Sequence, residues 1–391
     1  MRHGDPYGLH RVLEPVGTMP QAAWKLDNEM VCYDNEILIE VEVLNIDSAS
    51  FTQIKQEAGG NPQKVGEIMQ RIVRDRGKHH NPVTGSGGML VGRVREIGSE
   101  LAKKIELASQ RESAENSAPV SAARLAHAEN SALDAATRIE PAKASSNSGE
   151  PLKVGDRVAT LVSLSLTPLT IDEITRIDMK TGQVDIKGHA ILFESGIYAK
   201  MPDDLPDRIA LAVFDVCGAP AQTARLVKQG DSVVLFGAGG KSGLTVLRQA
   251  RLSSETGKIV AVEYGEEACN RVKSLGWADV VLNLDATKPA EVFRAVSNAL
   301  GGELADVVIN CVNVPNTEMS SILCAKDLGT VYFFSMATSF TAAALGAEGV
   351  GKDVNMVIGN GYCHGHANHA INLVRNTPEL LSVFEAKFAH S

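Results

Sequence analysis

The sequence predicts a two-domain α/β protein, with a β-rich domain over residues 1–204 and a doubly wound parallel sheet over residues 205–391. Two patterns support this fold class. Before residue 200, short runs with alternating polar and apolar residues are separated by glycine turns, which is typical of half-buried strands. After residue 207, apolar runs alternate with helical stretches, which indicates right-handed βαβ units. The 391 residues are enough for two separate cores.

In the first domain, residues 36–43 carry apolar side chains at every second position and predict a strand. A polar turn that contains Asp47 and Ser48 follows it. Residues 65–76 have the apolar spacing of an amphipathic helix. Further strands are expected at 89–97, 159–166, 184–186 and 190–193, and the last of them runs into Glu194.

The composition changes between residues 102 and 150, where alanine, serine, glutamate and asparagine dominate and no aromatic residue occurs. The pentapeptide Ala-Glu-Asn-Ser-Ala occurs twice there, at 114–118 and 128–132. Such a segment has too little large apolar surface to offset its ordering entropy. We expect a surface insertion without chemistry, part helix and part disordered, and a partner-binding helix is the alternative.

The second domain is expected to alternate regularly between helix and strand. Helices are predicted at 207–227, 242–252, 266–275, 288–300 and 317–326, and strands at 232–236, 258–262, 279–283, 306–311, 329–335 and 354–358.

The glycine turn after the first of these strands is the main functional signal. An apolar run, 232–236, leads through Gly237, Gly239 and Gly240 into a helix, with Lys241, Ser242 and Gly243 at the helix start. Glycines let the backbone approach a dinucleotide diphosphate, and the helix N-terminus presents free N–H groups to it. A phosphate loop of the Gly-x4-Gly-Lys-Ser type would need glycine at Leu235. A purely structural turn is the remaining alternative.

An acidic residue ends the next strand of the sheet. Glu263 could accept hydrogen bonds from a ribose 2′-hydroxyl and would repel a 2′-phosphate, so the sequence predicts NAD as the cofactor. Cys311 and Ser335 end two further strands and join the candidate cofactor-binding residues. Lys241 is expected near an anion, either the diphosphate or a substrate carboxylate, because a cation at a helix N-terminus is otherwise disfavoured.

Charge and cysteine usage narrow the class of protein. A formal net charge of −9 without a basic stripe makes nucleic acid an unsuitable partner. No apolar run is long enough to span a bilayer, and the N-terminus lacks the apolar core of a signal peptide. Six scattered cysteines without Cys-x-x-Cys spacing favour reduced thiols in a cytoplasmic protein.

The order of domains and motifs resembles the medium-chain dehydrogenase/reductase superfamily, which implies a GroES-like first domain, a Rossmann-type second domain and, by analogy, a homodimer. The matching segments are 45–48, Gly92-x5-Gly98, 154–158, the glycine turn, 275–281, 306–311 and 329–331. Within it, the sequence is similar to the L-erythro-3,5-diaminohexanoate dehydrogenase family of bacterial lysine fermentation. That similarity rests on residues 8–12, 47–55, 80–89, 159–169 and 192–200. It implies NAD-linked removal of the 3-amino group, which yields 5-amino-3-oxohexanoate and ammonia.

The ligands of the superfamily's catalytic zinc are largely missing. Asp47 takes the place of its first cysteine, 87–89 replaces its Gly-His-Glu motif, and only Cys217 remains. One thiol without an imidazole partner does not make a three-ligand site. Near the C-terminus Cys363, His364, His366 and His369 form a cluster, which we interpret as a helix with surface histidines. We therefore expect no metal.

Oxidative deamination needs a base for the substrate ammonium, a polar pocket for the iminium ion and a base for the attacking water. The resemblance puts Asp47 beside the reacting group and Ser48 against the substrate or the nicotinamide ribose. A turn aspartate that caps its own backbone is the alternative for Asp47. Two further residues are candidate catalytic groups. Glu194 is expected either at a cleft or as a solvated loop acid. His366 is expected either to shuttle a proton or to lie on the surface.

Two other functions remain open from the sequence. A zinc-free quinone or enoyl reductase of the same superfamily would usually carry basic residues after the second dinucleotide strand, where this chain has acidic ones at 263, 266 and 267. A catalytically silent dinucleotide-binding protein would leave the polar residues at 47 and 48 without a purpose.

Overall fold

The computed structural model describes residues 2–81, 85, 87–117, 144–145, 151–359 and 361–388. The chain divides into two compact units, residues 1–211 and 212–390. Each unit contains one large sheet, and the fold class predicted from the sequence is confirmed. Each of the two units has its own hydrophobic core.

The first unit is built around a seven-stranded sheet with the order β5-β9-β6-β4-β3-β8-β7. Its pairings are antiparallel except for β5 with β9. The strands are β3 (Glu36–Asn45), β4 (Met89–Ile97), β5 (Ala144–Ser145), β6 (Arg157–Thr160), β7 (Glu173–Ile177), β8 (Gln183–Phe193) and β9 (Tyr198–Lys200). A separate two-stranded sheet joins β1 (Val12–Glu14) and β2 (Lys25–Leu26).

The described residues of this unit include the α-helices α1 (Ser48–Glu57), α2 (Pro62–Arg76) and α3 (Ser99–Ser117) and the short 3-10 helices η1 (Leu9–Arg11) and η2 (Leu164–Leu166). Helix α2 shows why its sequence is helical: Asn61 caps its first N–H groups, Pro62 stands where no N–H is needed, and Gly77 ends it in the left-handed conformation. Its apolar side buries Val65, Met69 and their neighbours in the core.

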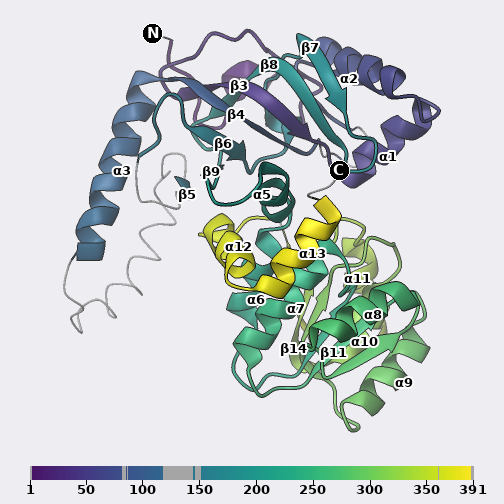
Figure 1. Cartoon of the computed structure of the whole chain (residues 1–391). Helices are drawn as coiled ribbons and strands as arrows, with labels where there is room; N and C mark the ends of the chain where they lie inside the picture. The colour runs from purple at the N-terminus through teal and green to yellow at the C-terminus, as the bar shows by residue number, and fades with distance from the viewer. Residues whose placement is uncertain are drawn as a thin grey trace. The chain divides into compact units, whose positions relative to one another are not determined.

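The second unit holds a parallel six-stranded sheet with the order β12-β11-β10-β13-β14-β15. Its strands β11 and β14 are labelled in Figure 1. This is the dinucleotide-binding strand order, in which the order of strand addition reverses between β10 and β13. The strands are β10 (Val233–Phe236), β11 (Ile259–Glu263), β12 (Val280–Asn283), β13 (Ala305–Asn310), β14 (Ala325–Phe333) and β15 (Asn355–Ile358). The central strand β10 is fully buried, as its unbroken apolar run requires.

The helices of this unit form two groups. Helix α12 (His366–Arg375) packs on α6 (Gly218–Leu226), α7 (Lys241–Ser254) and α13 (Pro378–Phe388). Helix α10 (Glu318–Cys324) packs on α9 (Pro289–Ala299) and α11 (Phe340–Val350). Helix α8 (Glu266–Leu275) lies against β11 and β12. Helix α5 (Asp207–Phe214), which precedes α6 along the chain, contains the division between the two units at residue 211.

Several sequence-based boundaries were wrong. The helix expected at 207–227 is two helices, α5 and α6, because Pro220 has to lie in the first turn of a helix. The turn expected at 45–50 contains the start of α1, and α11 was not predicted. The strand expected at 159–166 ends at Thr160, whereas 184–186 and 190–193 belong to one strand, β8. Of the insertion at 102–150, α3 continues to Ser117, and most of the rest lies outside the described residues.

Candidate functional site

The glycine turn of the second unit has the geometry of a phosphate cradle. Gly237 adopts a positive φ of 76°, which favours glycine, and Gly240 is the N-cap of α7 without a side chain that occupies the helix N–H groups. A Cβ at Gly243 would overlap the carbonyl oxygen of Gly237, so α7 approaches the turn as closely as glycine allows. Free N–H groups and the positive end of α7 therefore face the turn.

Glu263, the last residue of β11, reaches this turn. Its Oε2 accepts a hydrogen bond from the Gly239 N–H at 2.5 Å, and its Oε1 accepts one from the Tyr264 N–H at 2.9 Å. Each carboxylate oxygen accepts two hydrogen bonds, so both oxygens keep one lone pair for a ribose hydroxyl. The glycines and the acid that the sequence singled out are thus brought together.

The remaining cofactor candidates lie near the carboxyl ends of the strands. Lys241 forms an ion pair with Asp215, so an acid of the chain already partners its ammonium group. Burial raises the pKa of the Cys311 thiol to about 12, although the Ser242 side chain lowers it in part. The Ser335 Oγ lies 3.1 Å from Asn313 Oδ1, in the segment that follows β14.

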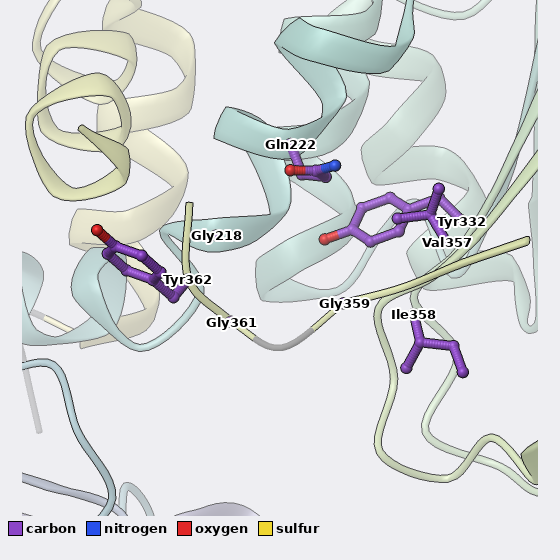
Figure 2. A pocket seen from close by; sticks show the side chains of 8 residues that line it. All are labelled: Gly218, Gln222, Tyr332, Val357, Ile358, Gly359, Gly361 and Tyr362. Carbon is purple, nitrogen blue, oxygen red and sulfur yellow. The ribbon is translucent and has the colours of Figure 1, made fainter. Parts of the chain in front are cut away.

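A cavity of about 210 Å³ opens at the carboxyl ends of β14 and β15, within the second unit. Figure 2 shows Gln222 of α6, Tyr332 of β14 and Tyr362 around it. The other lining residues are Gly218, Val357, Ile358, Gly359 and Gly361. In open α/β sheets ligands bind beyond this edge of the strands.

Asp47, in the first unit, is the N-cap of α1. Its Oδ1 accepts a hydrogen bond from the Ser50 N–H at 2.9 Å, and its Oδ2 accepts one from the Ser50 hydroxyl at 2.5 Å. Asn81 Nδ2 donates to the same hydroxyl at 3.1 Å. The capping role considered for this aspartate is therefore present, and the carboxylate keeps lone pairs for a ligand. The side chain of Ser48 lies outside the described residues.

His79 is a candidate that the sequence analysis missed. It is 1% exposed, and neither ring nitrogen has a hydrogen-bond partner among the residues that the structure describes. Burial lowers its pKa to about 4, although the charge of Asp47 and the backbone of Gly87 act in the opposite direction. A buried polar group without partners costs about 1–3 kcal/mol and calls for an explanation such as a catalytic role.

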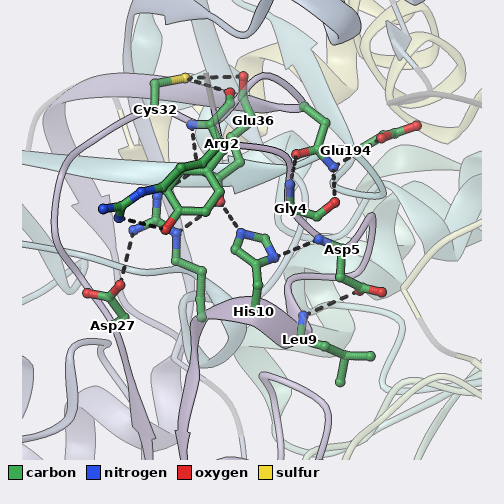
Figure 3. A network of polar contacts seen from close by, with 12 residues as sticks. Arg2, Gly4, Asp5, Leu9, His10, Asp27, Cys32, Glu36 and Glu194 are labelled. Carbon is green, nitrogen blue, oxygen red and sulfur yellow. Dashed lines mark hydrogen bonds and ion pairs between the residues drawn. The ribbon is translucent and has the colours of Figure 1, made fainter.

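Glu194 is not a solvated loop acid, which corrects one of the two sequence-based interpretations. It is 2% exposed; Lys104 donates to its Oε1 at 2.5 Å and Asn35 donates to its Oε2 at 3.3 Å. Figure 3 shows it beside the buried polar network of the N-terminal segment, in which Arg11 binds Glu36 through two hydrogen bonds of 2.9 and 2.7 Å. Both oxygens of Glu194 are therefore engaged within the first unit.

His366 is buried, so the surface histidine expected there is wrong. It begins α12, is 2% exposed and lies edge-on to the Tyr362 ring, with 5.0 Å between the ring centroids. Burial lowers its pKa to about 4. Its apolar neighbours on α12, which pack on α6 and α7, explain the burial, because they place this end of the helix in the interior.

Two absences concern only the part of the chain that the structure describes. There, no group of three or more histidine, cysteine, aspartate or glutamate side chains could hold a metal ion. No helix in the same part is both long and apolar enough to cross a membrane.

The chain is similar to known proteins in family, sequence and fold. Residues 10–118 and 135–202 match the model of the L-erythro-3,5-diaminohexanoate dehydrogenase N-terminal domain. The chain is 48% identical to an L-erythro-3,5-diaminohexanoate dehydrogenase of Acetoanaerobium sticklandii over 98% of its length and 99% of the relative. It is 46% identical to the enzyme of the same name from Fusobacterium nucleatum, with the same coverage. An alcohol dehydrogenase structure from Thermotoga maritima has a TM-score of 0.50 at 14% identity, covering 91% of this chain and 86% of the other.

Proposed function

Because the chain belongs to the L-erythro-3,5-diaminohexanoate dehydrogenase family, we propose that it oxidises L-erythro-3,5-diaminohexanoate with NAD to 5-amino-3-oxohexanoate and ammonia. The chain is thus an oxidoreductase that uses a nicotinamide dinucleotide. The observation that carries the substrate assignment is the 48% identity over nearly the whole of both chains. We propose that the reaction belongs to lysine fermentation.

The residues of the glycine turn fit the diphosphate of such a cofactor. We propose that the N–H groups at the start of α7, which follows the glycine turn along the chain, hold the diphosphate. The residues proposed to line the site are Gly237, Gly239, Gly240, Ser242, Gly243, Cys311 and Ser335. Glu263 supports NAD rather than NADP, since its carboxylate would repel a 2′-phosphate. When bound, the nicotinamide accepts the hydride from the substrate carbon. We propose that Lys241, whose ammonium group forms an ion pair with Asp215, also belongs to the cofactor site.

In the first unit, we propose that Asp47 binds the substrate ammonium and removes its proton, assisted by Ser48. The hydrogen bonds from Ser50 fix the carboxylate, so the orientation of its free lone pairs is set before the substrate arrives. His79 is neutral near pH 7 because of its lowered pKa, and it can accept a proton while the charge of Asp47 stabilises the imidazolium ion. We propose His79 as the group that receives the proton from the water that attacks the iminium ion.

Glu194 and His366 are better explained by structure. Lys104 and Asn35 already bind both oxygens of Glu194. His366 packs against Tyr362 in the second unit, and its pKa is shifted by burial with no acidic group among the causes. We propose that neither takes part in proton transfer.

The assembly and the compartment are proposals as well. The six cysteines are free thiols, as expected for a reducing cytoplasm. Strand β15 ends the sheet order and could pair with the same strand of a second copy across a two-fold axis, which would give a homodimer. We expect a small-molecule substrate, no metal and neither nucleic acid nor membrane as a partner.

One spectrophotometric comparison tests the function. The purified chain should form NADH from NAD with L-erythro-3,5-diaminohexanoate and not without it. Oxidation of NADH or NADPH by quinones, with no reaction of the diamino acid, would favour a quinone reductase instead. No reaction with either substrate, despite dinucleotide binding, would favour a catalytically silent protein.

A further inference from the structure

Arg76 holds a partly buried guanidinium group in a fixed orientation. It is the last residue of α2, and its guanidinium carbon lies 3.9 Å from the centre of the Trp24 ring, a stacking geometry that restrains the plane of the group. Its Nη1 donates to His80 Nδ1 at 2.8 Å and, more weakly, to the His80 carbonyl at 3.4 Å. In the described part of the chain, Nε and Nη2 have no hydrogen-bond partner, so one edge of the fork is available.

The positive charge of Arg76 is not balanced by an acidic side chain. Its neighbour Asp75 lies 3.7 Å from Arg74, and no described acid forms an ion pair with Arg76 itself. Burial lowers the pKa of Arg76 and Asp75 compensates only in part. Lys78 is also buried, donates only to the carbonyls of Pro20 and Gln21, and has a pKa lowered to about 8 by burial. An anion bound at the free edge of Arg76 would offset its unbalanced charge.

The same short segment leads from Arg76 to Asp47. Asn81, five residues after Arg76, donates to the Ser50 hydroxyl, which in turn donates to Asp47. Between them lies His79, and both charges act on its ring: Asp47 raises its pKa, while Arg76 and His80 lower it. A cation that Trp24 and His80 restrain and an anion that Ser50 restrains therefore both act on the ring of His79.

We propose that Arg76 binds the carboxylate of the substrate while Asp47 faces the 3-amino group. The inference rests on the proposed diamino acid dehydrogenation and adds the determinant of substrate choice. A 3-amino acid carries one negative and one positive group a few bonds apart, and Arg76 and Asp47 offer the complementary pair. A planar guanidinium restrained on one face by an indole suits two-point binding of a carboxylate.

A structural explanation competes with this one. Arginine near the C-terminus of a helix interacts favourably with the last carbonyl groups, and the Trp24 and His80 contacts also fasten the segment after α2. Under that explanation, replacing Arg76 would impair every substrate to a similar degree. The test must therefore compare substrates with and without the carboxylate.

The experiment measures kcat and KM of the full chain and of Arg76→Gln with L-erythro-3,5-diaminohexanoate and with 2,4-diaminopentane, which is the same diamine without its carboxylate. We expect Arg76→Gln to raise KM for the diamino acid by about 10- to 100-fold and to leave kcat/KM for the diamine within about threefold. Arg74→Gln, two residues earlier on the exposed side of α2, is the matched control and should leave both unchanged. Equal losses on both substrates, or no loss on the diamino acid, would overturn the inference.

A binding measurement separates this inference from the proposed function. If the wild-type chain did not oxidise the diamino acid at all, the proposed function would fail, and calorimetric titration with 3-aminobutanoate would still decide the role of Arg76. Binding to the wild type and to Arg74→Gln, with loss in Arg76→Gln, would support the carboxylate site. Equal affinity in all three proteins, or no binding to any of them, would contradict it.

Discussion

Replacing Asp47 by asparagine separates its charge from its role as a helix cap. Asparagine is as good an N-cap as aspartate, and its side-chain oxygen can still accept the hydrogen bond from the Ser50 N–H. The hydrogen bond from the Ser50 hydroxyl to Oδ2 would be lost or reversed, which costs about 1 kcal/mol. The fold should therefore lose little stability.

The chemical step should lose much more. If Asp47 takes the proton from the substrate ammonium, Asp47→Asn should lower kcat by roughly 100-fold or more. That factor corresponds to about 2.7 kcal/mol in the activation barrier, well above the stability effect. NAD affinity should change little, because the proposed cofactor site lies in residues of the second unit.

The assay is the initial rate of NADH formation at saturating substrate, with thermal unfolding recorded for each variant. Asn61→Ala serves as the control, since Asn61 caps α2 in the same way as Asp47 caps α1. It should lower stability by about 1 kcal/mol and leave kcat unchanged. A near-normal kcat for Asp47→Asn would remove Asp47 from the mechanism and leave it only its capping role.

Three further predictions concern the cofactor and pH. Gly243→Ala should raise the Kd for NADH by about tenfold or more, because the new Cβ overlaps the Gly237 carbonyl. Gly349→Ala on α11, outside the proposed cofactor site, meets nothing within 4 Å and should bind NADH normally. Equal Kd values for the two variants in a fluorescence titration would refute the close approach. Glu263→Gln should change the ratio of kcat/KM with NAD to kcat/KM with NADP by about tenfold in favour of NADP. An unchanged ratio would show that this carboxylate does not contact the ribose. Burial lowers the pKa of His79 from 6.5 to about 4, so this side chain binds a proton more readily in the unfolded chain. The free energy of unfolding should therefore fall by up to about 3 kcal/mol as the pH falls from 6.5 to about 4. In His79→Asn, the free energy of unfolding measured with denaturant should depend less on pH in this range, and an unchanged dependence would assign the titration to another group.

Local sequence patterns were sufficient to predict the elements that are determined by neighbouring residues along the chain. The turn after β10 could be predicted because glycine, a buried strand and a helix start follow one another along the chain. The division between α5 and α6 was missed, although Pro220 was a visible signal for a new helix start. The start of α1 at Asp47 was read as a turn because an N-cap and a turn favour the same residue types.

Tertiary burial was the part that the sequence did not reveal. From the sequence alone, His79 and His366 cannot be distinguished from surface histidines. Only the packing around them shows that both rings are buried. In the same way, the Lys104 partner of Glu194 lies 90 residues away and no spacing rule connects them. Sequence reasoning named the polar residues but could not say which of them are already paired.

The most direct test of the account is the stoichiometry of the reaction. With L-erythro-3,5-diaminohexanoate and NAD, the chain should release ammonia and form NADH in equal amounts, because removal of the amino group follows transfer of the hydride. Ammonia is measured enzymatically in the same samples in which NADH absorbance is read. NADH without ammonia, or ammonia without NADH, would contradict oxidative deamination as the function of this protein.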